Sequence, residues 1–146
     1  MRLSSTLGLV LSLAFGLWHF VIPYQFDWFG DVPDAPRAVV VSVDWVNFFF
    51  SLLLTGLSAL LLRFRRRLFR DPVARAFYGL LVLTWASRVV VTIVRPWAYD
   101  AMFAAQLAVF AAVFALLAIP LWAARRGPEP PPAADDRPAA DARKPW

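Results

Sequence analysis

The sequence predicts an all-α, polytopic integral membrane protein: a four-helix bundle with both its N- and C-termini on the cytoplasmic side. Three observations lead to this fold class. Hydrophobic residues make up 60% of the 146 residues and charged residues only 17%, whereas a soluble domain is about half apolar and about a quarter charged. The apolar residues fall in four long runs, and arginines gather between alternate runs. Uninterrupted runs of this length favour helices over the strands of a barrel.

Each run is long enough to cross a hydrocarbon core of about 30 Å at about 1.5 Å per residue. The first run also resembles a signal-peptide core, but it is long and has no small-residue cleavage site before Pro23. The third run is interrupted by Arg88. We therefore predict a transmembrane domain over residues 1–126. Its expected spans are residues 3–24, 40–62, 76–95 and 101–124.

The positions of lysine and arginine orient the spans. Twelve of these residues flank the spans on one side, mostly between the second and third runs and after the fourth, whereas Arg37 and Arg95 flank them on the other. The arginine-rich side is expected to be cytoplasmic. Most of the tryptophans and tyrosines fall near the opposite, outer interface, as in an aromatic belt. The tail, residues 127–146, is rich in proline, alanine and charge, and we predict that it is disordered.

Composition argues against several kinds of site. The sequence has no cysteine and one histidine, His19, so it cannot build a thiolate site or a histidine metal triad. We therefore expect no metal and no cofactor. The net charge is +5, but most of the arginine is used in setting topology, so nucleic acid is not an expected partner. Of the 15 basic residues all but one are arginine, a bias that favours a bacterial inner-membrane location.

Polar residues inside the spans are informative, because a charge at the centre of a spanning helix costs about 2.5–3.5 kcal/mol on insertion scales. In the second and third spans they recur every three or four residues and so share one helical face. Counting rise along each helix places five such residues about 5–10 Å inside the outer boundary. We predict that they form a polar cluster or ligand-binding site, with an ion pair between Asp44 and Arg88. The five are His19, Asp44, Asn47, Arg88 and Gln106.

A simpler explanation exists for each of these residues. Asp44 is explained equally by a place at the membrane interface, and Arg88 by extension of its long side chain to the outer surface. His19 would then be a packed residue bonded to neighbouring backbone, and Asn47 and Gln106 would join helices by hydrogen bonds. Small residues recur on the first and fourth spans and predict close helix contacts. They are Gly8, Ser12 and Gly16 on the first, and Ala104, Ala108, Ala111, Ala115 and Ala118 on the fourth.

No phosphate-binding loop, nucleophile elbow or metalloprotease motif is present in the sequence. In size and number of spans it resembles small four-helix bacterial membrane families such as the DoxX-like proteins, and this resemblance assigns no functional residue. The expected function is that of a non-catalytic accessory, assembly or scaffold subunit, whose partners are the lipid bilayer and other membrane subunits or further copies of the chain. One alternative is a binder of a lipid or quinone, with acid–base chemistry at His19. A third is proton-coupled transport through His19 and Asp44.

Overall fold

The computed structural model describes residues 2–28, 30, 33–96 and 101–126, and every regular element in them is a helix. Three helices, α3, α4 and α5, are long and apolar enough to cross a membrane. This confirms the predicted all-helical class and indicates a membrane protein. The predicted disordered tail, residues 127–146, lies outside the described residues. The helices are α1 (Arg2–His19), α2 (Ile22–Gln25), α3 (Arg37–Arg63), α4 (Pro72–Val94) and α5 (Ala101–Arg125).

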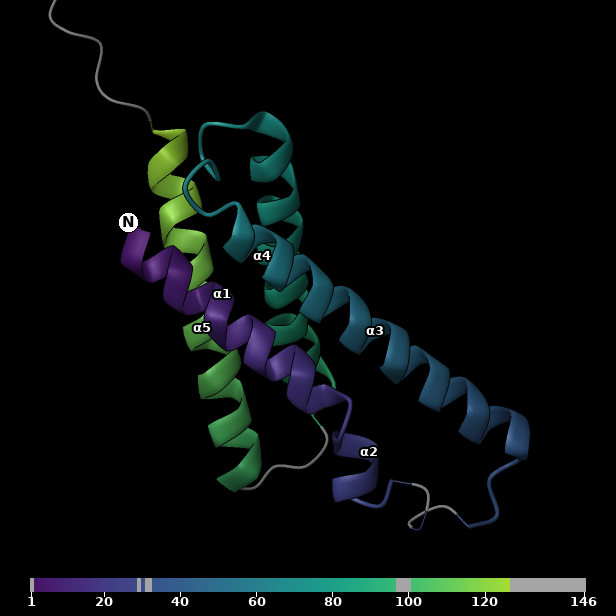
Figure 1. Cartoon of the computed structure of the whole chain (residues 1–146). Coiled ribbons are helices and arrows are strands. Elements are labelled where there is room, and N and C mark those ends of the chain that lie inside the picture. Colours follow the sequence, from purple (N-terminus) through teal and green to yellow (C-terminus); the bar gives the residue numbers. More distant parts are fainter. Residues whose placement is uncertain (1, 29, 31–32, 97–100, 127–146) are drawn as a thin grey trace, which may run out of the picture.

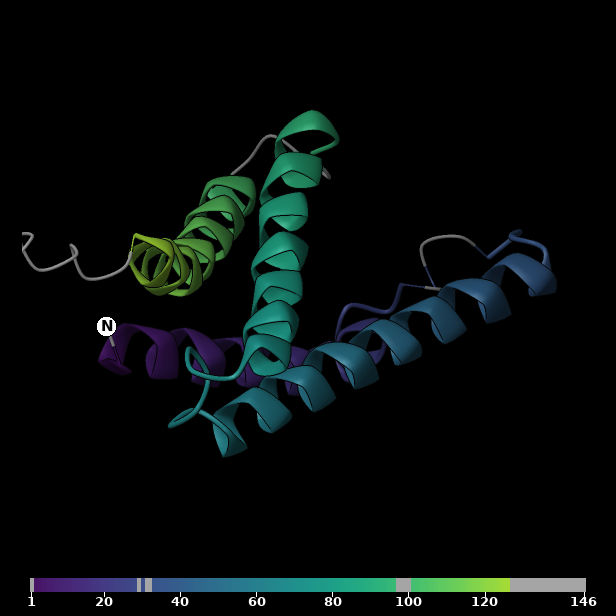
Figure 2. The same ribbon diagram turned by 90° about the horizontal axis from the view of Figure 1, so that it is seen from above.

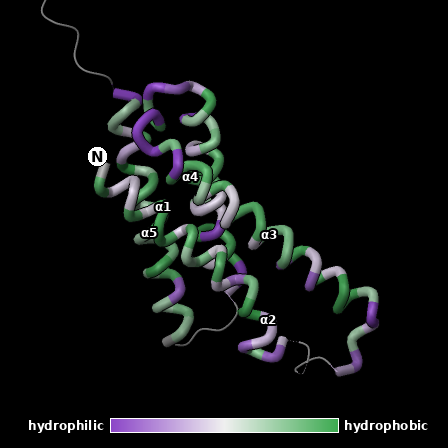
Figure 3. Tube along the Cα trace, viewed as in Figure 1, coloured by the Kyte–Doolittle hydropathy of each residue, from purple (hydrophilic) through white to green (hydrophobic). Residues whose placement is uncertain are grey.

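Helices α1 and α3 run side by side in opposite directions, and α4 and α5 cross them at a steep angle (Figures 1 and 2). Contacts join α1 to both α3 and α5, and α4 to both α5 and α3. The first turns of α3 extend well beyond the other helices in both views. Hydrophilic residues gather in the connection between α3 and α4, whereas the helices themselves are mainly hydrophobic (Figure 3).

The first apolar run is divided, so the described chain has five helices and not the four that the sequence predicted. Helix α1 ends at His19, and α2 begins at Ile22 after a turn. Proline has no N–H, so Pro23 cannot donate to the carbonyl four residues earlier, that of His19. Asn47 Nδ2 of α3 donates to this oxygen instead, at 3.1 Å. In the third run, by contrast, Arg88 does not interrupt the helix, because α4 continues through it to Val94.

A second proline is accommodated in the same way inside α5. Pro120 is fully buried and lies within the helix, where it leaves the carbonyl of Leu116 without its usual donor. The Ser4 hydroxyl of α1 donates to this oxygen at 2.9 Å. Apolar helices tolerate proline where a side chain from a neighbouring helix bonds the freed carbonyl. Each proline therefore leaves a carbonyl free to accept a hydrogen bond from another helix, and these two bonds help to fix α1 against its neighbours.

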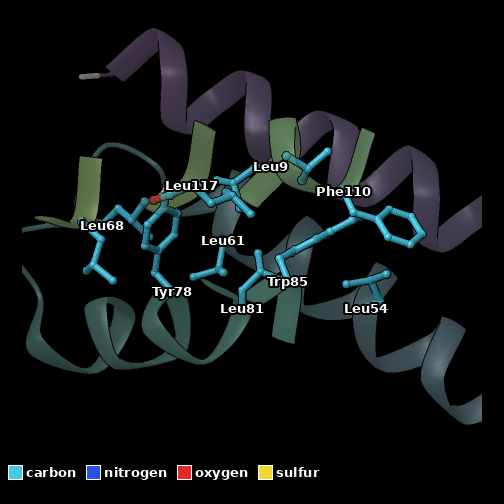
Figure 4. Close-up of a cluster of buried hydrophobic side chains, with 11 residues drawn as sticks. Leu9, Leu54, Leu61, Leu68, Tyr78, Leu81, Trp85, Phe110 and Leu117 are labelled. Carbon is cyan, nitrogen blue, oxygen red and sulfur yellow. Dashed lines mark hydrogen bonds between the residues drawn. The ribbon is translucent and has the colours of Figure 1, made fainter. Parts of the chain in front are cut away.

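The core between the helices combines apolar packing with a few enclosed hydrogen bonds. Leucines from α1, α3, α4 and α5 pack around Tyr78, Trp85 and Phe110 (Figure 4). The Tyr78 hydroxyl donates to the Leu117 carbonyl at 2.9 Å, and Trp85 Nε1 donates to Ser12 Oγ at 3.0 Å. Ser58 Oγ of α3 also bonds Ser12 Oγ, at 2.9 Å. Tyr78 and Trp85 are thus buried with their polar atoms satisfied, as expected for such side chains in an apolar interior.

Helices α1 and α3 approach each other closely at Gly16. A β-carbon added there would lie 2.6 Å from Thr55 Oγ1 and 2.9 Å from the Thr55 backbone nitrogen. The backbone of α3 could not yield to it without moving the helix. The sequence pattern of small residues therefore marks a true helix contact on α1, since Gly8 also packs against α5, at Leu117.

Replacing Gly16 by alanine should destabilise the protein. Inserting a methyl group into a packed interior costs about 1–3 kcal/mol, which should lower the midpoint of thermal unfolding in detergent. Gly56 is the matched control, because a β-carbon there meets nothing within 4 Å. Gly56→Ala should leave the midpoint unchanged or raise it. Equal midpoints for the two variants would contradict the close contact at Gly16.

The role of Ser4 can be tested through its dependence on Pro120. Ser4→Ala leaves the Leu116 carbonyl without a donor, and an unpaired buried polar group costs about 1–3 kcal/mol. In a Pro120→Ala background the restored N–H of residue 120 bonds the same carbonyl, so Ser4→Ala should cost less there. The measurement is a double-mutant cycle of unfolding free energies. Additive effects would show that Ser4 does not compensate for the proline.

Candidate functional site

Three helices meet at a buried polar cluster made of His19, Asn47 and Arg88. Each ring nitrogen of the histidine faces one partner: His19 Nδ1 lies 3.0 Å from Asn47 Oδ1, and His19 Nε2 lies 3.2 Å from Arg88 Nη2. His19 is at the last position of α1, while Asn47 and Arg88 lie within α3 and α4. His19 and Asn47 are both buried. We call these three residues the polar cluster.

The hydrogen bonds assign the protonation of the imidazole. Asn47 Nδ2 donates to the His19 carbonyl, so its Oδ1 is the acceptor for the Nδ1–H of the ring. A guanidinium has donors only, so Nε2 must accept from Arg88. His19 is therefore neutral and protonated at Nδ1. The ring has no free lone pair and no free N–H.

Three phenylalanine rings surround the Arg88 guanidinium. Its central carbon lies 5.4 Å from the ring centre of Phe15, 5.6 Å from that of Phe50 and 4.7 Å from that of Phe110. Each ring is within the range of about 6 Å over which a cation is attracted to an aromatic face. The rings come from α1, α3 and α5, so the contacts of this one guanidinium join three helices to α4.

The sequence analysis did not identify these rings, although a signal was present. Phe15 precedes His19 by one helical turn, and Phe50 follows Asn47 by three positions. Residues three and four apart share a helix face, so each ring belongs to the same face as a predicted polar residue. The rings of Phe15 and Phe50 also both lie 5.1 Å from the His19 ring.

The predicted ion pair between Asp44 and Arg88 is absent. Arg88 bonds His19, and no salt bridge joins Arg88 to Asp44, both of which lie in the described part of the chain. Asp44 is half-buried and lies to one side, nearer the start of α3. Gln106 is exposed on α5, and its side chain forms no hydrogen bond with a described residue. The structure thus unites His19, Asn47 and Arg88 and leaves Asp44 and Gln106 outside the polar cluster.

Asp44 instead lines a hollow between the α1–α2 segment and the start of α3. The hollow has a volume of about 420 Å³ and also includes Phe20, Tyr24 and Trp45. Asn47 borders it as well, so this side chain contacts both the hollow and His19. Among the residues described, no group of three or more histidine, aspartate or glutamate side chains is arranged to hold a metal ion.

Comparison of the chain with protein-family models, with curated proteins and with solved structures finds no match in any of the three. No residue role is therefore transferred from a relative. Any functional assignment must rest on the geometry of the chain itself.

The protonation of His19 gives a direct test of the polar cluster. In ¹⁵N NMR of the protein in detergent near neutral pH, Nδ1 should have the chemical shift of a protonated nitrogen and Nε2 that of an acceptor. Asn47→Leu removes the acceptor for Nδ1–H and should abolish this preference. Protonation at Nε2 in the unmodified protein would refute the assigned hydrogen bonds.

Two double-mutant cycles distinguish the observed pairing from the one predicted by sequence. His19→Phe and Arg88→Met should be coupled, by about 0.6 and at most about 1.7 kcal/mol, the range measured for polar pairs between membrane helices. Asp44→Asn and Arg88→Met should be additive, because these two residues do not touch. Unfolding free energies in mixed micelles provide the measurement. Strong coupling in the second cycle would support the ion pair between Asp44 and Arg88 that the sequence predicted.

Proposed function

We propose that the chain is a bacterial inner-membrane protein that acts as a non-catalytic accessory, assembly or scaffold subunit of a larger membrane complex. The proposal rests on one observation: the small-residue face of α5 points away from the bundle. Ala104, Ala108, Ala111 and Ala115 are all exposed. The chain packs the opposite face of α5 into its core, through Phe110 and other large residues. The predicted contact face is left for another molecule.

A surface of this kind suits helix association in a membrane. Lipid chains are as apolar as leucine, so spanning helices associate mainly where small side chains let their backbones approach closely. The alanines of α5 leave such an approach open along several turns. On this proposal the partner is a spanning helix of another subunit or of a second copy of this chain.

The proposed topology has four membrane-crossing segments, α1, α3, α4 and α5, with both termini in the cytoplasm. Helix α1 has 18 residues, which gives it a length of about 27 Å against a hydrocarbon core of about 30 Å. The short α2 would then lie at the outer interface. The alternating directions of the four helices and the many arginines between α3 and α4 support this arrangement.

The state of His19 favours a non-catalytic role. A general acid or base needs a ring nitrogen within reach of its substrate, and both nitrogens of His19 are engaged by Asn47 and Arg88. Proton-coupled transport through His19 and Asp44 has less support for the same reason. The second candidate is the binding of a lipid or quinone, which the hollow beside Asp44 favours.

Purification at native expression in mild detergent tests the subunit proposal. We expect a stoichiometric partner chain or a stable homo-oligomer. Ala108→Phe should reduce its recovery about tenfold or more, because disrupting the packing at the centre of an interface costs at least about 1–2 kcal/mol. Leu83→Phe is the control: Leu83 is 63% exposed on α4, away from the alanine face. Recovery of the unmodified chain as a solitary monomer would refute the proposal.

A further inference from the structure

The hollow beside Asp44 has no part in the helix contacts that the subunit proposal uses. It lies beside the first half of α3, where the α1–α2 segment packs against this helix. Its walls come from two segments, the α1–α2 segment and α3, and the rings of Phe20 and Phe48 pack edge to face with their centres 5.6 Å apart. Such a volume, about 420 Å³, is within the range of small-molecule sites.

The carboxylate of Asp44 is left without a counter-ion. No described residue forms an ion pair or hydrogen bond with it, although it is half-buried in a helix that is apolar enough to span a membrane. A charge held near apolar surroundings is expected to have a partner. No lysine or arginine is among the residues that line the hollow, so a positively charged group of another molecule is the partner that this carboxylate would bind most strongly.

The aromatic side chains of the hollow indicate which kind of cation it would bind. Tyr24 and Trp45 line the hollow together with the carboxylate, and the faces of such rings attract ammonium groups. A carboxylate together with aromatic rings forms the usual recognition site for an organic ammonium ion. The same walls contain no lysine or arginine, so they favour a cation over an anion.

The order of side chains along α3 matches an amphiphile. Asp44 and the 64% exposed Trp45 are toward the outer end of the hollow, and Phe48 and Phe49 follow one turn deeper, each about half exposed. Tyrosine and tryptophan are common at the level of lipid headgroups, whereas the phenylalanines offer an apolar surface for acyl chains. We propose that this hollow binds a zwitterionic lipid through its ammonium headgroup, with Asp44 as the counter-ion.

The proposal can be tested by lipid exchange on the purified full-length chain. Native mass spectrometry would measure retention of phosphatidylethanolamine and phosphatidylglycerol, supplied at equal mole fraction in detergent micelles. The ethanolamine lipid should be retained about tenfold more, since a hydrogen bond to a charged group contributes about 1.5 kcal/mol or more. Asp44→Asn should remove this preference. Asp34→Asn, a matched change at an exposed carboxylate outside the hollow, should preserve it.

Two results would overturn the proposal. The first is equal retention of the two lipids by the unmodified chain, which is also the result expected if a basic residue of a partner protein occupies the hollow. The second is an unchanged preference in Asp44→Asn, which would show that Asp44 does not recognise the ammonium group. Trp45→Leu provides a second variant if Asp44→Asn does not fold, and it should also reduce the preference. None of these outcomes depends on whether a partner subunit binds α5.

Discussion

A buried polar group without a partner is costly inside an apolar helical bundle, and this cost decides how α1 is held, although the buried Thr55 hydroxyl has no hydrogen-bond partner among the described residues. Two prolines, Pro23 and Pro120, each leave a carbonyl without its helical donor. Asn47 and Ser4 supply the missing donors from other helices. Because water is absent from the interior of a bilayer, such bonds cannot be exchanged for hydration. The hydrogen bonds to the two freed carbonyls therefore connect the helices, and they help to set the position of α1 relative to α3 and α5.

The polar cluster obeys the same requirement with a charged group. Among the described residues no carboxylate pairs with Arg88, and its charge is met by a neutral imidazole and three aromatic rings. Asn47 holds His19 in the one tautomer that can accept from a guanidinium. The described structure therefore holds Arg88 without the ion pair to Asp44 that the sequence had predicted.

The sequence predicted the long helices well because long apolar runs leave few alternatives. The predicted spans 40–62, 76–95 and 101–124 agree with α3, α4 and α5 to within a few residues. The break after His19 was missed, because its cause is a donor absent at Pro23 and a replacement on a distant helix. The predicted depth of the polar residues along their helices was also useful, since three of the five form the polar cluster. Asp44 does not form the predicted ion pair with Arg88, and Gln106 lies outside the polar cluster, because the sequence supplies depth along each helix but not the crossing angle of the helices. The first turns of α3 extend away from α4 (Figure 2).

The unequal lengths of α1 and α3 have a consequence for the surrounding bilayer. With 18 residues α1 measures about 27 Å, whereas the 27 residues of α3 measure about 40 Å. Two neighbouring helices of such different length cannot both match one hydrocarbon thickness. On the proposed topology α3 must tilt or protrude while lipid beside α1 thins, each at a cost of about a fraction of a kcal/mol per ångström. The protein would therefore impose an asymmetric hydrophobic mismatch on its lipid annulus, and membrane thickness would bear on the tilt of α3.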